Sequence, residues 1–297
     1  MQKFPTKIMF FDIPTQVGIP TSPNTWKLRF VLNFKRLAYT TRWTPTSLAT
    51  QTCIENGIPA SGTKSDGGPH YTLPALIDYT PQLHEASTEP VRLTDSTHII
   101  EYLEKAYPEA SFPAPGAGDD YPHSRELFPA RSRALHALVE HHVQNVLKPP
   151  LYDLFTLALY DTKLPIDQVD YAIRKPKSRG LERLEDLQVH GEAEREKVWA
   201  KLRAAFKVLA QAAEAGEKFY ETEKRDEVER SANGIPVFQP PGVTYADFAV
   251  TAVLMMIRNI SRDEAWKQVK VWDGGRWERL LTEMERRWGT IDEKMIT

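Results

Sequence analysis

Three short segments of the chain carry groups that suit one small-molecule site. They are Ser22-Pro23 at the expected start of a helix, Leu73-Pro74 before an expected strand, and Asp95-Ser96 at the start of another helix. Helix N-termini present unpaired backbone N–H groups and the positive end of the helix dipole, so they attract anions. Taken together, the three segments suit a peptide-like thiol that carries several negative charges.

Ser22 has two possible roles. A serine before a proline is an ordinary N-cap, which contributes about 1 kcal/mol to helix stability. Its hydroxyl could also donate to a bound thiolate and lower a thiol pKa from about 8.5 toward neutrality, which supplies a nucleophile at cellular pH. Asn24, two residues later, could donate its amide to the same sulfur or support the cap, and the sequence leaves these alternatives open.

Alternating strands and helices are expected to position these segments. Apolar patterns predict strands at 7–12, 39–43, 75–79 and 91–93, and helices from Ser22, over 46–56 and over 96–106. This order resembles a thioredoxin-like domain, with an insertion at 80–90 between the last two strands. The sequence therefore predicts an α/β unit over residues 1–108.

The rest of the chain is expected to be helical. A Pro-rich stretch at 109–122 reads as a linker, and apolar residues recur at helical spacing over 125–147, 192–215 and 244–260. Pro149-Pro150 is expected to interrupt the helices, and the mixed-charge run at 217–230 is expected to be a solvated excursion between two of them. We therefore expect an all-helical domain over 123–297.

Composition limits the classes of partner. With 38 Lys and Arg against 40 Asp and Glu, the 297 residues have a net charge of −2, so there is no overall attraction to nucleic acid or to an anionic membrane surface. No stretch approaches the roughly 18 apolar residues of a membrane span, so a cytoplasmic protein is expected. The single cysteine, Cys53, excludes an intrachain disulfide and a cysteine-based zinc cluster. We expect Cys53 in the core, and no metal site.

The order of the three segments resembles the cytosolic glutathione transferase pattern, in its serine type. The run Leu73-Pro74-Ala75-Leu76 is similar to the Val/Leu-Pro-Ala-Leu of that family, and the residues after Ser96 are similar to its Ser-x-x-Ile-x-x-Tyr-Leu. Thr244-Tyr245-Ala246-Asp247-Phe248 resembles the capping box that opens a central helix of the family's second domain. The resemblance thus covers both halves of the chain and implies a thioredoxin-like domain followed by an all-helical one.

The resemblance also implies roles for single residues. Ser22, with Asn24 as an alternative donor, would stabilise the thiolate of glutathione. The peptide bond before Pro74 would be cis, and the Leu73 backbone would pair with the cysteinyl backbone. Asp95 and Ser96 would bind the ammonium and carboxylate of the γ-glutamyl end. The loop that carries Lys64, His70 and Tyr71 would meet the glycyl carboxylate, with Lys64 or His70 as its ionic partner unless both are simply exposed loop residues.

Within the family, the Ser-Pro-Asn-Thr-Trp-Lys run at 22–27 looks most like the etherase-like branch, the fungal class related to bacterial β-etherases. This implies glutathione as co-substrate, a hydrophobic aromatic second substrate lodged against the helical domain, and a homodimer. The implied reaction is attack of the thiolate on an electrophilic carbon, in conjugation or aryl-ether cleavage, with possible peroxide reduction. Two alternatives stay open, a non-catalytic ligandin for aromatic compounds and an interaction scaffold.

Overall fold

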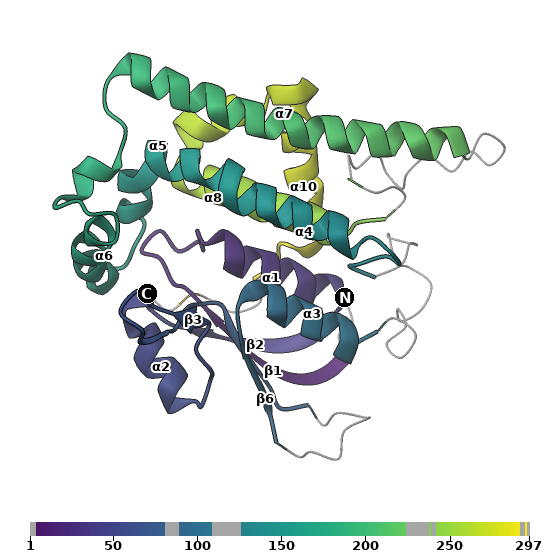
Figure 1. Ribbon diagram of the computed structural model, residues 1–297. Coiled ribbons are helices and arrows are strands. Elements are labelled where there is room, and N and C mark those ends of the chain that lie inside the picture. Colours follow the sequence, from purple (N-terminus) through teal and green to yellow (C-terminus); the bar gives the residue numbers. More distant parts are fainter. Residues whose placement is uncertain are drawn as a thin grey trace.

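A computed structural model describes residues 4–80, 89–108, 126–223, 238, 242–291 and 295. Its sheet contains β1 (Phe4–Asp12), β2 (Leu37–Trp43), β5 (Ala75–Asp78) and β6 (Val91–Thr94), in the spatial order β2-β1-β5-β6. β1 and β2 are parallel, and the other two neighbouring pairs are antiparallel. This is the expected thioredoxin-like arrangement, and an all-helical domain follows it (Figure 1).

Alternate residues of β1 face different helices, as the two-residue period of a strand requires. Ile8 and Phe10 pack with α1 (Pro23–Phe34) and α3 (Ser96–Ala106) in the main core. Phe11 packs on the other face with Cys53 of α2 (Ala49–Glu55), which a short 3₁₀ turn (Thr46–Leu48) precedes. Cys53 is fully buried, so its predicted place in the core is confirmed.

The helical domain lies above α1 in Figure 1, with the long helix α7 across its top. Its helices are α4 (Arg133–His142), α5 (Lys148–Asp161), α6 (Pro165–Lys177), α7 (Glu192–Glu223), α8 (Tyr245–Ile260), α9 (Lys267–Val269) and α10 (Arg276–Trp288). No helix of the described ranges combines the length and the apolar character needed to cross a membrane.

Two predictions about elements need correction, and one hairpin was missed. Pro149-Pro150 does not interrupt the helices, because a π-helical turn (Val143–Leu147) joins α4 to α5 and both prolines sit in the first turn of α5, where no N–H is needed. α7 continues through Glu223, so the first part of the charged run is helical. A hairpin of β3 (Gly62–Thr63) and β4 (Pro69–His70) was not predicted, because two-residue strands leave no apolar pattern.

Some predicted segments are described only in part or not at all. Residues 81–88 of the insertion, the linker at 109–122 and residues 224–230 of the charged run lie outside the described residues. The helix expected over 125–147 begins at Arg133 in the described part.

Helix α1 is surrounded by protein on nearly every side. All of its residues except Asn24 are buried. Its apolar side chains contact the sheet below and the helical domain above, where Phe34 lies edge-on to Phe248 of α8 and to Trp288 of α10, each with ring centroids 5.2 Å apart. Burial on both sides makes α1 the element that joins the two domains.

A capping box opens α8, as predicted. The buried Asp247 carboxylate accepts hydrogen bonds from the backbone N–H and the hydroxyl of Thr244, at 2.8 and 2.9 Å, and from the N–H of Phe238 at 2.9 Å. These bonds satisfy donors that a buried helix start would otherwise leave unpaired.

We expect Asp247→Ala to lower the free energy of unfolding by about 2–4 kcal/mol, because it removes a cap and leaves buried donors without an acceptor. Urea denaturation measures the change. Asp263→Ala, at an exposed position in the helical domain, is the control and should stay within about 0.5 kcal/mol of the parent. Equal effects of the two substitutions would contradict this role of the box.

Candidate functional site

The three segments lie beyond one end of the strands β1, β5 and β6. β1 ends at Asp12 and leads through a loop to Ser22. β5 begins at Ala75, which pairs with Phe11 of β1 and with Thr94 of β6. Pro74 enters β5, Asp95 leaves β6, and the loop to Ser22 leaves β1, so all three lie beyond the same end of these strands.

The start of α1 is held from both domains. Ser22 is the N-cap, and its carbonyl accepts from the Trp26 N–H at 3.1 Å. The preceding loop is tied down at the Pro20 carbonyl, which accepts from the Trp26 indole at 2.8 Å and from the Asn259 amide of α8 at 3.0 Å. These bonds give the start of the helix a defined position.

The Ser22 hydroxyl is nearly free of hydrogen bonds to the described residues. Its Oγ accepts only a long bond of 3.4 Å from the Thr25 N–H, and within the described ranges its proton has no acceptor. Ser22 and Asn24 are both half-buried, while their neighbours on α1 are buried. The Ser22 hydroxyl proton, the Asn24 N–H, which has no partner among the described residues, and the positive end of the α1 dipole therefore favour a negative sulfur here.

The Leu73–Pro74 peptide bond is cis, as the resemblance implies. In the described part of the chain, neither the N–H nor the C=O of Leu73 has a hydrogen-bond partner, so both can pair with an extended peptide. Nearby, Lys64 and His70 are exposed on the β3–β4 hairpin, and Tyr71 is half-buried. Within the hairpin, the Lys64 N–H donates to the Gly68 carbonyl at 2.8 Å.

Asp95 caps α3 with a positive φ of 67°. Its Oδ1 accepts from the backbone N–H of Thr97 at 2.9 Å and of His98 at 3.2 Å. The other carboxylate oxygen and the Ser96 hydroxyl have no hydrogen-bond partner among the residues that the structure describes. Asp95 is thus a helix cap whose charge is still available for an ammonium group, and Ser96 offers a donor to a carboxylate.

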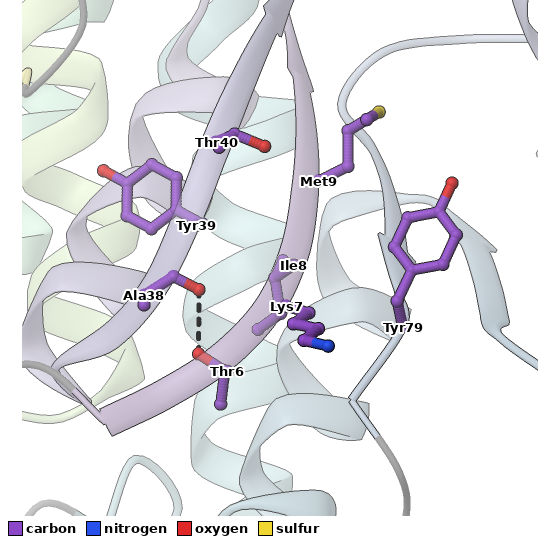
Figure 2. A pocket seen from close by; sticks show the side chains of 8 residues that line it. All are labelled: Thr6, Lys7, Ile8, Met9, Ala38, Tyr39, Thr40 and Tyr79. Atoms are coloured by element: carbon purple, nitrogen blue, oxygen red, sulfur yellow. Dashed lines mark hydrogen bonds between the residues drawn. The ribbon is translucent and has the colours of Figure 1, made fainter.

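A cavity of about 380 Å³ lies elsewhere on the sheet. Figure 2 shows it between the first half of β1 (Thr6 to Met9), the start of β2 (Ala38 to Thr40) and Tyr79. Met9 and Ile8 pair with Ile77 and Asp78, at the far end of β5 from Pro74. The cavity therefore belongs to the opposite end of the sheet and has no part in the candidate site.

A closed ring of polar side chains joins the site helices to the helical domain. Lys27 of α1 donates to Oε1 of Glu140 and to the Tyr245 hydroxyl, both at 2.9 Å. Tyr245 donates to Oε2 of Glu140 at 2.7 Å, and its hydroxyl lies 3.3 Å from that of Thr97. Thr97 follows Ser96 directly, so the ring connects the start of α1 with the start of α3.

The ring keeps Glu140 ionised. Burial alone would raise the pKa of its carboxyl, but the Lys27 ammonium and the bonds from Lys27, Tyr245 and Gln144 hold that pKa below its ordinary value. For Tyr245, burial and the neighbouring Glu140 raise the pKa of the phenol, which therefore stays protonated and donates. Sequence reasoning missed this ring, because Lys27, Glu140 and Tyr245 lie far apart in the chain and no local pattern links them.

Comparisons with known proteins agree with this geometry. The profile of the glutathione S-transferase C-terminal domain matches residues 134–288, and that of the glutathione S-transferase N-terminal domain matches residues 17–111. The chain belongs to the glutathione S-transferase family. A search of curated proteins found no match.

Solved structures of fungal glutathione transferases share the whole fold. The glutathione S-transferase CsGST63524 of Ceriporiopsis subvermispora, in complex with glutathione, has a TM-score of 0.75 and 27% identity and covers 96% of this chain and 99% of its own. CsGST83044 of the same fungus, also in complex with glutathione, has a TM-score of 0.72 and 27% identity, with coverages of 94% and 98%. Glutathione transferase GSTFuA3 from Phanerochaete chrysosporium, at 24% identity, has a TM-score of 0.74 with coverages of 97% and 99%, which shows the fold alone.

We expect Glu140→Gln to lower the free energy of unfolding of this transferase by about 3–5 kcal/mol, because it leaves the Lys27 ammonium, 3% exposed, without a counter-charge. Tyr245→Phe keeps the Lys27–Glu140 ion pair and should cost about 1–2 kcal/mol. Urea denaturation gives both values.

The control for this comparison is Glu194→Gln, which removes one surface ion pair with Lys197, the two side chains being 61% and 66% exposed. It should change the stability by no more than about 0.5 kcal/mol. A Glu140→Gln protein as stable as the Glu194→Gln protein would rule out a stabilising ring.

Proposed function

We propose that this family member is an active, serine-type glutathione transferase of the etherase-like kind, in which the Ser22 hydroxyl stabilises the glutathione thiolate. The proposal rests on the position of Ser22, Leu73 and Asp95-Ser96 beyond the same end of β1, β5 and β6. Each of these segments has polar groups without a hydrogen-bond partner among the described residues. The glutathione held by CsGST63524 supports the choice of thiol.

In this mechanism Ser22 donates its hydrogen bond to sulfur and is not itself a nucleophile. The hydrogen bond and the positive end of the α1 dipole favour the thiolate over the thiol, so the thiol proton is lost to solvent near neutral pH. The thiolate then attacks an electrophilic carbon, a C–S bond forms, and the bond to the leaving group breaks. The protein's further contribution is to orient both reactants.

The ends of glutathione are assigned by charge. Asp95 binds the γ-glutamyl ammonium and Ser96 its carboxylate, while Leu73 pairs with the cysteinyl backbone. Lys64 or His70 meets the glycyl carboxylate beside Tyr71, and Asn24 supports the sulfur site. We infer as well that the second substrate is aromatic and that the protein forms a homodimer, as the resemblance implies.

The first test is binding. Glutathione at about 100 times its dissociation constant should stabilise the native state by about 2.7 kcal/mol and raise the Tm. An unmoved Tm at millimolar glutathione would refute the site. Binding without turnover of a generic aryl electrophile would instead favour a ligandin.

Ser22→Ala should lower kcat far more than it weakens glutathione binding, because the lost bond serves the thiolate and not the ends of the tripeptide. We expect a loss of at least about tenfold in kcat. Steady-state kinetics with an aryl halide measures it. Ser261→Ala is the matched control, since Ser261 is also a serine N-cap, which accepts from the Ala265 N–H at 3.2 Å. Equal kinetic losses in the two variants would reduce Ser22 to a cap.

Asp95→Asn and Ser96→Gly should act on binding instead. Asparagine caps a helix as well as aspartate and tolerates the positive φ, so Asp95→Asn removes only the charge that meets the ammonium. A charge-assisted hydrogen bond of about 1.5–3 kcal/mol corresponds to a tenfold to hundredfold rise in the KM for glutathione, with kcat little changed. Unchanged KM values in folded proteins would leave Asp95-Ser96 as a helix start only.

A further inference from the structure

Polar residues recur at four-residue spacing along α4 and α5, and the first of them, Glu140, contacts Lys27 of the first domain. Glu140, Gln144 and Lys148 lie one above the next, because Gln144 donates to Glu140 at 2.8 Å and Lys148 donates to Gln144 at 2.6 Å. Tyr152 follows at the same spacing. The four residues form what we call the α4–α5 stripe.

Two contacts join the chain on either side of the stripe to residues that flank Ser22. At one end Glu140 binds Lys27, five residues after Ser22. Beyond the other end, the backbone N–H of Gln16, six residues before Ser22, donates to the carbonyl of Thr162 at 3.0 Å. Lys148 and Tyr152 lie between these two contacts along the chain, so we infer that they belong to the part of the helical domain nearest the start of α1.

Positive charge around the stripe exceeds negative charge, because Lys27 and Lys175 act on Lys148 together with a single carboxylate, that of Glu140. Lys148 is only 5% exposed, and among the described residues its ammonium has one hydrogen-bond partner, the neutral amide of Gln144. Lys175 of α6 is half-buried beside Tyr152, with its Nζ 5.6 Å from the centre of the ring. Glu140 already serves Lys27, so Lys148 and Lys175 have no carboxylate of their own in the described part of the chain.

Of the four other carboxylates of α5 and α6, Asp161 is exposed at the end of α5 and three are engaged elsewhere. Asp153 pairs with Arg179 at 3.3 Å, and Asp170 pairs with Arg174 at 3.0 Å. Asp167, fully buried, accepts from the backbone N–H groups of Thr46 and Ser47 in the first domain at 3.1 and 2.8 Å. None of the three is left to neutralise the stripe.

The titration of the two lysines is consistent with this imbalance. Burial, and then the charge of Lys27, lower the pKa of Lys148 to about 8, against the attraction of Glu140. Burial also lowers the pKa of Lys175, with help from Arg179 and Arg174. A buried ammonium that lacks a counter-charge gains from an incoming anion, because a charge-assisted bond replaces lost hydration.

We propose that Lys148 and Lys175 bind the carboxylate of the second substrate, and that Tyr152 packs against its aromatic ring, so that this transferase selects anionic aryl compounds. The inference rests on the proposed function and names the substrate class of the same site. Lys27 is paired with Glu140, so it does not bind the substrate carboxylate directly. The glycyl carboxylate of glutathione is assigned to the β3–β4 hairpin and does not compete for the two lysines.

The test is a binding measurement without glutathione. Calorimetric titration compares 3,5-dinitrobenzoate with its uncharged methyl ester on the wild-type protein and on Lys148→Met, Lys148→Arg and Lys175→Met. The wild type should bind the benzoate at least about tenfold more tightly than the ester. Either methionine variant should lose most of that preference and keep its affinity for the ester, while Lys148→Arg should retain the preference. Lys177→Met, exposed in the last turn of α6, is the control and should behave as the wild type.

Each result decides for or against the site. Equal binding of acid and ester by the wild type overturns the proposal, and so does an equal loss in Lys148→Met and Lys177→Met. In a separate titration with glutathione, a tenfold weaker affinity of Lys148→Met also overturns it, because Lys148 would then bind the tripeptide. If Lys148→Met does not fold, as judged by circular dichroism, Lys175→Met decides alone. Because the titration contains no glutathione, a preference for the benzoate stands even where transferase activity is absent.

Discussion

Helix α1 carries two cations into the interior, and each must meet a counter-charge on a different layer of the molecule. Arg29 pairs with Asp12 at the end of β1, at 2.7 Å, with both side chains at most 1% exposed. Lys27 pairs across the domain boundary with Glu140 at 2.9 Å. A buried charge without its partner costs several kcal/mol, so the native fold needs each of the two pairs. They set the position of α1, and with it that of Ser22, between the sheet and the helical domain.

The elements that position the site are visible in local sequence signals, and the contacts between domains are not. Ser22 before a proline and Asp95 before a helical pattern mark helix starts, because capping is decided within a few residues. The partner of Lys27 is 113 residues away, and no local pattern shows which carboxylate it meets. The same holds for Lys148, whose burial depends on how α5 packs among the other helices of its domain.

The errors about elements have a common physical reason. Proline predicts a break only where its missing N–H would have been bonded, and Pro149-Pro150 falls in a first turn that a π-helical segment leads into. A run of charged residues predicts a solvated segment, yet α7 continues through Glu223, and half-buried Glu217 at the start of the run pairs with Arg276 at 2.8 and 2.9 Å. The backbone of both segments thus depends on position within a helix and on distant partners, which composition does not show.

The central claim is that the start of α1 makes glutathione a thiolate. The most direct measurement is a pH titration of the ultraviolet absorbance of the thiolate, on glutathione bound to the wild type and to Ser22→Ala, with Ser261→Ala as the control. Our account predicts a bound thiol pKa at least about one unit below the free value of about 8.5 in the wild type and in the control, and a return toward the free value in Ser22→Ala. A bound thiol that titrates at the same pH in wild type and Ser22→Ala would contradict it.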